Sequence, residues 1–564
     1  MKGLYKTEQI LKIEEETKQE AGIPEMVLME RAALQVADLI CSRYERTKRV
    51  LCLCGCGNNG GDGVAVARIL YERGWQVCYT IVGNQEKMTP ALKSQVETAR
   101  VSNVRYKEFE YICQQDDGYD IVVDALFGTG ISREIGGVFL QAIQWAVGQT
   151  EHIVSVDIPS GVSGDTGQIM GTAVKAEVTV TVGVNKPGLI LYPGRSYAGE
   201  VKLVDIGYPS ALVDKVTPFA YYYEKEDIRK KLPPRPAYSN KGTFGKVLVA
   251  AGSETMCGAC LMAAAAAYKM GAGLVRGCTV KENREVIFGR LPEAVFTTRE
   301  ELEEGLAWAD AVVAGPGLGR SDEALSFMNR LLEQNKKPLV IDGDGIYLAR
   351  QCKRELPSGT IITPHLKELE GFAEVSVIGH PEKLPQIVSG LAADRGIIVV
   401  GKDAKTVVSN GQECYINDTG NNGMATGGSG DVLAGMTAGL LAQKMDSFEA
   451  AKLAVYLHGA AGDVMKEKKS SFTGSIGFVL AAAGSAVGVG NIWRFPYLCA
   501  KDGGGLFLLI YLILVLTFGF TLLTTDVAIG RKTKQNALNA YATLHEKWRF
   551  LGYLTFLVPT LIMT

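Results

Sequence analysis

The chain has 564 residues, 47% of them hydrophobic, and a formal net charge of −2 at neutral pH. This length predicts about four domains of ordinary size and allows large buried cores. The 59 basic and 61 acidic side chains leave no basic excess, so we expect no nucleic-acid partner. Twelve cysteines in a chain this long do not form a disulfide scaffold, which favours a reducing compartment.

Residues 1–222 alternate short apolar runs with helical patterns, which predicts a parallel sheet covered by crossover helices. The N-terminal ten residues lack the apolar stretch of a secretory signal, so we expect this part of the chain in the cytoplasm. Strands are predicted at Val50–Cys54, Val77–Val82, Ile121–Ala125, Ile153–Asp157 and Val178–Val182, and helices at Met26–Tyr44 and Val64–Arg73.

The glycine-rich motif CGCGNNGGDG at residues 54–63 follows the first of these strands and opens a helix. It contains the GxGxxG spacing of dinucleotide-binding dehydrogenases, which is a weak signal by itself. A dehydrogenase would place an acidic residue at the end of the next strand to hold a ribose, but that strand ends in IVG at residues 81–83. Asn58, Asn59 and Asp62 add side-chain oxygens where a dehydrogenase has bare backbone, which indicates a different kind of nucleotide site.

Polar side chains also follow two later strands of the same region. Asp124 ends the run IVVDA and precedes LFGTG, while Asp157 ends IVSVD and precedes Ile-Pro-Ser160-Gly. The carboxyl ends of parallel strands share one edge, so these groups are expected to converge on one crevice. Their hard oxygens suit an alkali or alkaline-earth cation, and Lys186 is a candidate partner for Asp157. Ordinary turn chemistry of Asp and Asn is the alternative.

Residues 223–470 repeat the α/β rhythm after a proline-rich linker at residues 232–240. This pattern predicts a second parallel sheet with Ala-rich helices on its faces. Strands are predicted at Val247–Ala251, Ala311–Ala314, Leu339–Ile341, Thr360–Thr363 and Ile397–Val400, and helices at Leu261–Met270 and Val432–Leu441.

The block GNNGMATGGSGDVLAGMTAG, residues 420–439, is the most informative stretch of the chain. Its glycines let backbone N–H groups approach an anion closely, and the helix that follows adds its positive N-terminal dipole. Asp431 stands at the mouth of this phosphate cradle, where a carboxylate is explained by a general base in phosphoryl transfer. The alternative is a helix N-cap on a glycine-rich turn, which does not explain the number of glycines.

Taken together, the motifs resemble those of the bacterial bifunctional NAD(P)H-hydrate repair enzymes, which act on NAD(P)HX, the hydrated form of NAD(P)H. The first region carries NNGGDG, DALFGTG, DIPSG and KPG, and the second carries NKGTFG, AGPGLG, TPHLKELE, GKDAKT and NNGMATGGSGDVLAG. The resemblance implies an NAD(P)HX epimerase with a Rossmann-like three-layer α/β fold over residues 1–222. It implies an ADP-dependent NAD(P)HX dehydratase with a ribokinase-like α/β fold over residues 223–470. The likeness stops at HGAAGD, residues 458–463, so we expect the closing helix of this domain to be missing.

For the epimerase, the resemblance implies a substrate site and a potassium site. Asn59, Asp124 and Ser160 would hold K⁺. We expect Asp157 to move a proton, with Lys186 stabilising the charge. The residues implied to bind NAD(P)HX are Asn58, Asn59, Gly60, Gly61, Asp62, Gly128, Thr129, Gly130, Ile131, Ser132, Arg133, Glu134 and Asp157.

For the dehydratase, the resemblance implies that Asp431 deprotonates the C6 hydroxyl of NAD(P)HX for attack on ADP, with Mg²⁺ accompanying the phosphates. Ser429 stands where the family usually has Thr. We expect a homo-oligomer. The implied ligands are Ala259, Gly317, His365 and Asp431 for the hydrate, and Lys402, Asp403, Ala404, Lys405, Thr406 and Gly430 for ADP or AMP.

A vitamin kinase on the same ribokinase-like fold is the rival interpretation of the second region. Its phosphate cradle and its base would have the same sequence pattern, and its substrate would be a hydroxymethyl or hydroxyethyl group. The attached first region favours the repair enzyme, because two such domains share a purpose only when they act on one hydrated nucleotide.

The composition changes near Lys469. No charged residue occurs in residues 470–493 or 503–525, and each run is long enough to cross a bilayer as a helix. Basic residues flank the two runs, which would keep both ends in the cytoplasm. A third apolar run begins at Leu551, and a buried core hairpin is the alternative.

The motif GSAVGVGN at residues 484–491 makes this tail similar to the first transmembrane helix of neurotransmitter:sodium symporters. We therefore expect residues 471–564 to be a truncated symporter fragment in the cell membrane, with two α-helical transmembrane segments and the start of a third. Transport is not expected, because symporter sites form between two inverted repeats. The change indicates a join within residues 469–475, made by gene fusion or during sequence assembly, and a genuine fusion would anchor the enzyme at the membrane.

Overall fold

The structure is a computed structural model that describes residues 1–114, 118–352, 354–470 and 545. The chain divides into two compact units, residues 1–467 and 468–564, and the first contains both α/β regions. The membrane-spanning segments expected within residues 471–564 lie outside the described residues. Among the helices that are described, none has both the length and the apolar character required to cross a bilayer.

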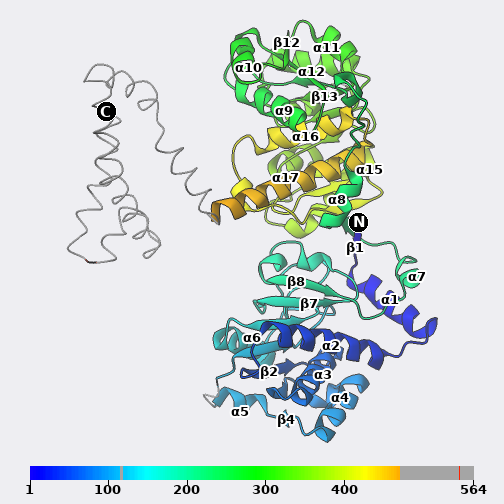
Figure 1. The fold of residues 1–564 in the computed structure, drawn as a ribbon, viewed down its shortest axis with the longest axis vertical. Helices are drawn as coiled ribbons and strands as arrows, with labels where there is room; N and C mark the ends of the chain where they lie inside the picture. The colour runs from blue at the N-terminus through cyan, green and yellow to red at the C-terminus, as the bar shows by residue number, and fades with distance from the viewer. Residues whose placement is uncertain (115–117, 353, 471–544, 546–564) are drawn as a thin grey trace, which may run out of the picture. The chain divides into compact units, whose positions relative to one another are not determined.

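The first region contains a seven-stranded parallel sheet with helices on both faces (Figure 1). Helices α2 (Glu25–Arg43), α3 (Asn58–Glu72) and α4 (Pro90–Val101) pack on one face, and α5 (Phe109–Gln114) and α6 (Gly137–Gln149) on the other. This is the expected three-layer Rossmann-like fold. The strands, in spatial order, are β4 (Arg105–Tyr106), β3 (Gln76–Ile81), β2 (Arg49–Cys54), β5 (Ile121–Ala125), β6 (Ile153–Val156), β7 (Val178–Val182) and β8 (Glu200–Val204).

The second region is built on an eleven-stranded sheet. Its central strands are parallel, and its strands β17 and β18 form an antiparallel hairpin. In spatial order the strands are β1 (Lys2–Leu4), β9 (Ala220–Tyr222), β18 (Cys414–Ile416), β17 (Val407–Ser409), β16 (Ile398–Gly401), β15 (Ile361–Ile362), β14 (Leu339–Ile341), β13 (Ala311–Ala314), β10 (Lys246–Ala250), β11 (Leu274–Thr279) and β12 (Val295–Thr298).

Helices cover both faces of this second sheet, which confirms the ribokinase-like α/β prediction. One face packs on α9 (Cys257–Lys269), α10 (Arg284–Arg290), α16 (Ser429–Ala442) and α17 (Ser447–Ser470). The other packs on α11 (Leu302–Trp308), α12 (Asp322–Gln334), α13 (Asp344–Gln351), α14 (Leu366–Ala373) and α15 (Leu384–Arg395).

All ten strands expected from apolar runs are present, each within one residue of the predicted ends. The eight strands that the sequence did not indicate are β1, β4, β8, β9, β11, β12, β17 and β18. Four of these (β1, β9, β17, β18) have only three residues and β4 has two, too few for an alternating pattern.

The first α/β region begins and ends with strands of the second sheet. Strand β1 pairs antiparallel with β9, so that Lys2 lies opposite Tyr222, and β9 continues parallel to β18. Strand β1 therefore belongs to the second sheet, the first region follows it in the sequence, and the chain joins the second sheet again at Ala220. The short helices α1 (Thr7–Gln19) and α7 (Ser210–Val213) lie in the connections.

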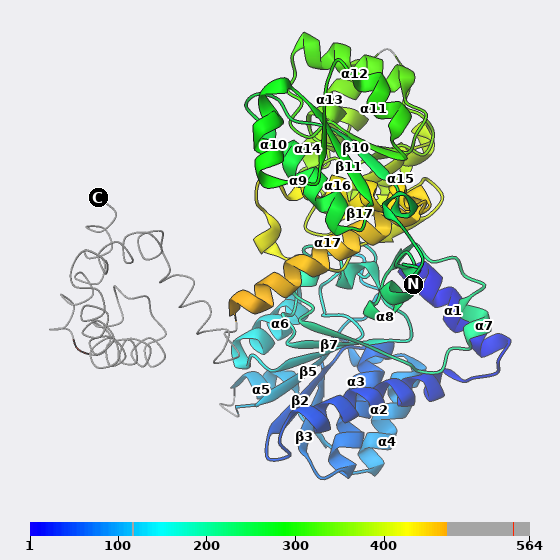
Figure 2. The same ribbon diagram turned by 45° about the horizontal axis from the view of Figure 1, so that its top comes forward.

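Helices α9 and α16 lie side by side (Figures 1 and 2) because glycine replaces larger residues at their contact. A Cβ atom on Gly435 would lie 2.1 Å from the carbonyl oxygen of Ala263, and one on Gly439 would lie 2.8 Å from that of Ala267. The close packing fixes where α16 begins, and Asp431 lies in its first turn.

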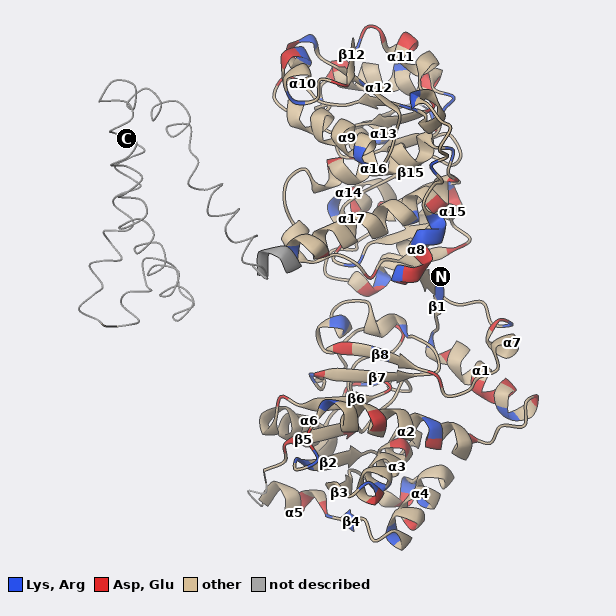
Figure 3. Ribbon diagram, in the orientation of Figure 1, with Lys and Arg blue, Asp and Glu red and all other residues tan. Residues whose placement is uncertain are grey.

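Helix α17 is fixed at its N-terminal half by buried ion pairs. Lys452, which is 1% exposed, contacts Glu449 at 2.7 Å and Glu413 at 2.9 Å. Glu449 also pairs with Lys231 of α8 (Lys225–Lys231), a helix that is almost wholly charged (Figure 3). These contacts hold α17 against the second sheet and leave its C-terminal half to contact the glycine-rich loop.

Replacing Gly435 with Ala is expected to lower the free energy of unfolding by roughly 1–3 kcal/mol, because the new methyl group overlaps the α9 backbone. Gly390 in α15 is the matched control, since no atom would lie within 4 Å of a Cβ added at that position. Gly390→Ala should be neutral or stabilise by up to about 1 kcal/mol. Urea unfolding of both variants tests this, and an equal effect at the two positions would contradict it.

Candidate active sites

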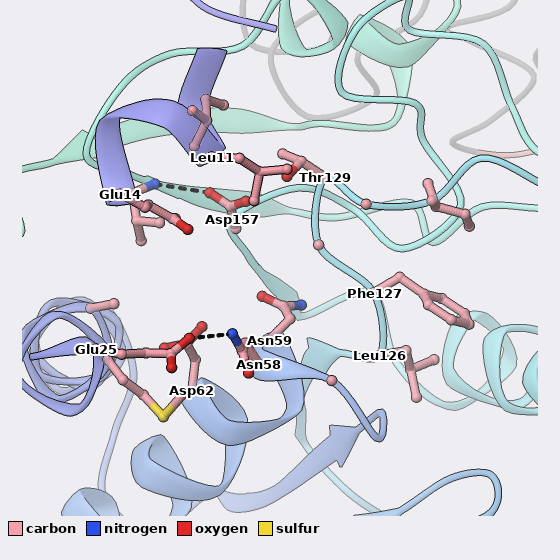
Figure 4. Close-up of a pocket in the computed structure, with 18 of the residues that line it drawn as sticks. Leu11, Glu14, Glu25, Asn58, Asn59, Asp62, Leu126, Phe127, Thr129 and Asp157 are labelled. Carbon is pink, nitrogen blue, oxygen red and sulfur yellow. Dashed lines mark hydrogen bonds between the residues drawn. The ribbon is translucent and has the colours of Figure 1, made fainter. Parts of the chain in front are cut away.

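A pocket of about 670 Å³ lies at the carboxyl ends of the strands of the first sheet (Figure 4). Figure 4 shows Glu14 and Asp157 on one side and Glu25, Asp62 and the Asn58–Asn59 pair on the other. Ten of the residues expected to bind NAD(P)HX line it: Asn58, Asn59, Asp62, Gly128, Thr129, Gly130, Ile131, Ser132, Arg133 and Asp157.

The other three expected ligands do not line this pocket. Gly60 and Gly61 are buried within α3, where a Cβ atom would lie 1.9 Å from the carbonyl oxygen of Gly55 or 2.7 Å from Met29. Their absent side chains allow α3 to begin against strand β2 and the neighbouring helix. Glu134 lies beyond the pocket-lining part of its loop.

Asp157 and Lys186 form a buried ion pair at the end of strand β6. The Lys186 ammonium is 1% exposed and also donates to Thr181 Oγ1 at 2.8 Å and to the Val182 carbonyl at 3.0 Å. Asp157 accepts from the Val182 N–H at 3.2 Å and has a left-handed backbone φ of 69°. An Asp in this conformation is uncommon, and here it aims the carboxylate into the pocket while Lys186 holds it from behind.

Three further acidic groups lie in the pocket, and the sequence did not mark two of them. Burial raises the pKa of Glu14, which accepts a hydrogen bond from Tyr208 at 3.1 Å. Burial, followed by repulsion from Asp157 and Glu14, raises the pKa of Asp62 well above its usual value. Glu25 accepts from Asn58 at 2.5 Å. Glu14 lies in the acidic run EEET of an ordinary amphipathic helix, so nothing in the sequence distinguishes it.

Of the three residues expected to hold K⁺, Asp124 and Ser160 are in direct contact and buried, whereas Asn59 lines the pocket. Asp124 accepts from Ser160 Oγ at 2.5 Å, from the Ser160 N–H at 2.8 Å and from Ser155 Oγ at 2.7 Å. Ser160 Oγ also lies 3.3 Å from the Phe127 carbonyl. A Cβ atom on Gly128 would lie 3.6 Å from Asn59 Cβ. The Nδ2 atom of Asn59 is buried and has no hydrogen-bond partner. The carboxylate, hydroxyl and carbonyl oxygens around Asp124 are the ligand types that hard cations prefer.

In the second region, Asp431 lies beside a second buried Asp–Lys pair. Lys402 Nζ donates to Asp342 at 2.6 Å, and Thr363 Oγ1 donates to the same carboxylate at 2.6 Å. A Cβ atom on Gly430 would lie 3.1 Å from Lys402 Nζ and 3.3 Å from Asp342, so only glycine leaves this space open. Burial, followed by repulsion from Asp342, raises the pKa of Asp431 to about 6.

These contacts bring Lys402, Gly430 and Asp431 together at the N-terminus of α16, where the helix begins after Gly428 with φ 88°. The sequence did not name Asp342, although it follows strand β14 just as Asp124 and Asp157 end theirs. That strand-end pattern is the signal that identifies it.

Of the remaining residues expected in the dehydratase site, Ala259 lies in the first turn of α9 and the others lie in loops or at a helix cap. Ala259 lies beside Gly317, since a Cβ atom added at Gly317 would lie 2.9 Å from Ala259 Cβ. His365 caps α14, accepting from the Glu368 N–H at 3.2 Å, and its backbone bridges to Lys402. Lys405 is buried and donates to Asp418 rather than toward Asp431. Asp403, Ala404 and Thr406 complete the turn between β16 and β17.

The fold and the two sites define a two-domain α/β enzyme with one pocket beyond a Rossmann-like sheet and one glycine-lined helix start on a ribokinase-like sheet. Family models match three segments: NAD(P)H-hydrate dehydratase over residues 247–476, YjeF-related protein N-terminus over residues 25–188, and the sodium:neurotransmitter symporter family over residues 469–564. The dehydratase match continues past residue 463, which corrects the expectation that the likeness ends there.

Curated relatives match both regions at once. The chain is 36% identical to the bifunctional NAD(P)H-hydrate repair enzyme of Thermofilum pendens over 487 residues, covering 81% of this chain and 91% of the relative. It is 33% identical to that of Escherichia coli, covering 79% and 86%. Among solved structures, the ADP/ATP-dependent NAD(P)H-hydrate dehydratase from Bacillus subtilis is 30% identical, covers 44% of this chain and 90% of its own, and has a TM-score of 0.41. The chain belongs to the family of bifunctional NAD(P)H-hydrate repair enzymes.

Removing one partner of the Asp157–Lys186 pair leaves a buried, uncompensated charge. Lys186→Met is therefore expected to lower the free energy of unfolding of the first region by roughly 3 kcal/mol. The double variant Asp157→Asn with Lys186→Met removes both charges and should recover most of that loss. Denaturant unfolding of the single and double variants measures the coupling, and additive losses would contradict the pairing.

Proposed function

We propose that the pocket of the first region interconverts the R and S forms of NAD(P)HX, and that the glycine-lined site of the second region dehydrates the S form with ADP. The observation that supports this best is a carboxylate with a pKa of about 6 at the start of a glycine-lined helix. Family membership of both regions supports the shared hydrate substrate.

In the dehydratase, Asp431 takes the proton of the C6 hydroxyl as that oxygen attacks the β-phosphorus of ADP, and AMP leaves. The C6–O bond then breaks with its electron pair on phosphate, and a proton lost from C5 restores the double bond of NAD(P)H. Lys402, held by Asp342, provides positive charge beside the phosphoryl group, while the helix N-terminus and glycine N–H groups contact its oxygens.

Mg²⁺ would be held mainly by the phosphates of ADP, because Asp342 is already paired with Lys402 and Thr363 and Asp431 acts as the base. When present, the ion neutralises the phosphate charge. Among the described residues, no cluster of three or more His, Cys, Asp or Glu side chains forms a metal site, so the nucleotide itself supplies most of the ligands in this proposal.

In the epimerase, Asp157 accepts the hydroxyl proton of C6 while the C6–N1 bond opens and its electron pair moves to N1. N1 then attacks the other face of the C6 carbonyl, Asp157 returns the proton to the oxygen, and the configuration at C6 is inverted. Lys186 holds the Asp157 carboxylate in place through the buried ion pair. A potassium ion held by Asn59, Asp124 and Ser160 would offset the buried Asp124 charge and fix the loop that carries Gly128–Arg133.

For the tail, we propose a membrane-bound fragment of symporter origin over residues 471–564, supported by the family match over residues 469–564. Homo-oligomerisation of the catalytic regions stays a prediction. Fractionation of cells that express the full chain should place it in the membrane fraction, whereas a chain ending at residue 470 should stay in the supernatant. Equal distribution of the two chains would contradict the anchor.

Incubating the full chain with NADHX and ADP should restore the absorbance of the reduced nicotinamide. Asp431→Asn should abolish this recovery at every pH, because the amide takes no proton. Asp157→Asn should instead stop R/S exchange and leave dehydration of the S form intact. A stable phosphorylated product without recovery of absorbance would favour the vitamin kinase.

The rate of dehydration should fall as pH drops through about 6, since Asp431 must be ionised to act as the base. Below that pH, kcat/KM should decrease by about tenfold per unit. Asp342→Asn removes a negative neighbour that raises the pKa of Asp431, so it should move the acid limb to lower pH. If the acid side of the pH–rate profile does not move in Asp342→Asn, the titrating group is not Asp431.

A further inference from the structure

The motif HGAAGD at residues 458–463 lies in helix α17, and one side of the helix here contacts the glycine-rich loop before α16. Its four non-alanine residues are spaced at i, i+1, i+4 and i+5, so they project from the same side of the helix. Each of them contacts the loop of residues 419–429. No role in the chemistry proposed above uses these residues.

Asp463 makes the strongest of these contacts. One carboxylate oxygen accepts from the Gly420 N–H at 2.8 Å, and the other accepts from Asn421 Nδ2 at 2.8 Å. Gly420 has a φ of 104°, a conformation that other residues rarely adopt. A single side chain of α17 therefore fixes the point where the loop leaves its preceding strand.

The two glycines of the motif let the loop lie directly on the helix. A Cβ atom on Gly459 would lie 2.3 Å from Thr419 Oγ1, and one on Gly462 would lie 2.4 Å from Met424 Sδ. Thr419 Oγ1 also donates to the Tyr456 carbonyl at 2.9 Å. The helix surface is thus shaped to fit this loop.

The fourth residue, His458, reaches the other end of the loop. Its Nε2 lies 3.4 Å from Ser429 Oγ, in the first turn of α16. Burial, followed by the nearby Lys402 charge, lowers the pKa of His458, so the imidazole is neutral at physiological pH. The motif therefore contacts the loop at its beginning, its middle and its end.

We propose that this face of α17 holds the glycine-rich loop in its nucleotide-binding conformation, with Asp463 as the positioning residue. The inference rests on the proposed function of the loop in binding ADP. A loop this rich in glycine loses much conformational entropy when it orders. Ordering the loop in advance removes that cost from nucleotide binding. The contact between α17 and the loop is therefore expected to affect ADP affinity more than the chemical step.

The test compares Asp463→Ala with Asp446→Ala in the full chain. Asp446 also accepts two backbone N–H groups, those of Phe448 and Glu449, but it caps the N-terminus of α17 far along the helix from the loop. Asp463→Ala should raise the KM for ADP by roughly ten- to hundredfold with a smaller change in kcat. Asp446→Ala should lower the melting temperature and leave the KM for ADP unchanged.

Hydrogen–deuterium exchange without nucleotide gives a readout that does not depend on ADP. Amides of residues 419–424 should exchange faster in Asp463→Ala than in the wild type or Asp446→Ala, and Asp463→Asn should be intermediate because it keeps one acceptor. Unchanged exchange and an unchanged KM for ADP in Asp463→Ala would overturn the proposal that α17 holds the loop. If ADP fails to raise the melting temperature of the wild-type chain, the proposed function is overturned. Faster exchange in Asp463→Ala would still support the proposal that α17 holds the loop.

Discussion

A buried aspartate–lysine ion pair at the end of a parallel strand is the interaction on which each site depends. Asp157 with Lys186 supports the epimerase pocket, and Asp342 with Lys402 supports the start of α16. In both, the lysine follows a later strand of the same sheet; Lys186 is 1% exposed and Lys402 is 20% exposed. Such a pair is maintained only when further hydrogen bonds offset the loss of hydration, and here Thr181 and Thr363 supply them.

The two pairs differ in where the paired carboxylate lies. In the first pocket, the paired Asp157 carboxylate itself faces the cavity, and the lysine holds it in that direction. In the second, Asp342 stays behind the site and its charge raises the pKa of the separate Asp431. The same strand-end ion pair thus orients a carboxylate toward the cavity in one region and raises the pKa of a neighbouring carboxylate in the other.

Glycine determines how closely backbone approaches backbone around both sites. Gly60 lets α3 begin against β2, Gly435 lets α16 lie on α9, and Gly459 lets the nucleotide loop lie on α17. The loop contacts α9 beside Gly428 and α17 beside Gly459 and Gly462, while residues 422–423 and 425–427 are exposed. Since α17 is itself fixed by the buried Lys452, it connects the second sheet to the loop.

The amino-acid sequence was enough to establish the two α/β regions, ten of their strands and the strand-end residues Asp124 and Asp157, because apolar runs and glycine motifs are local patterns. It also identified Lys186 as the partner of Asp157. The folded chain was needed to show that Glu14 enters the first pocket, that β1 joins the second sheet and that Asp463 lies on the nucleotide loop. These contacts join residues far apart in the chain, and their energies come from burial and hydrogen bonding that exist only when the chain is folded.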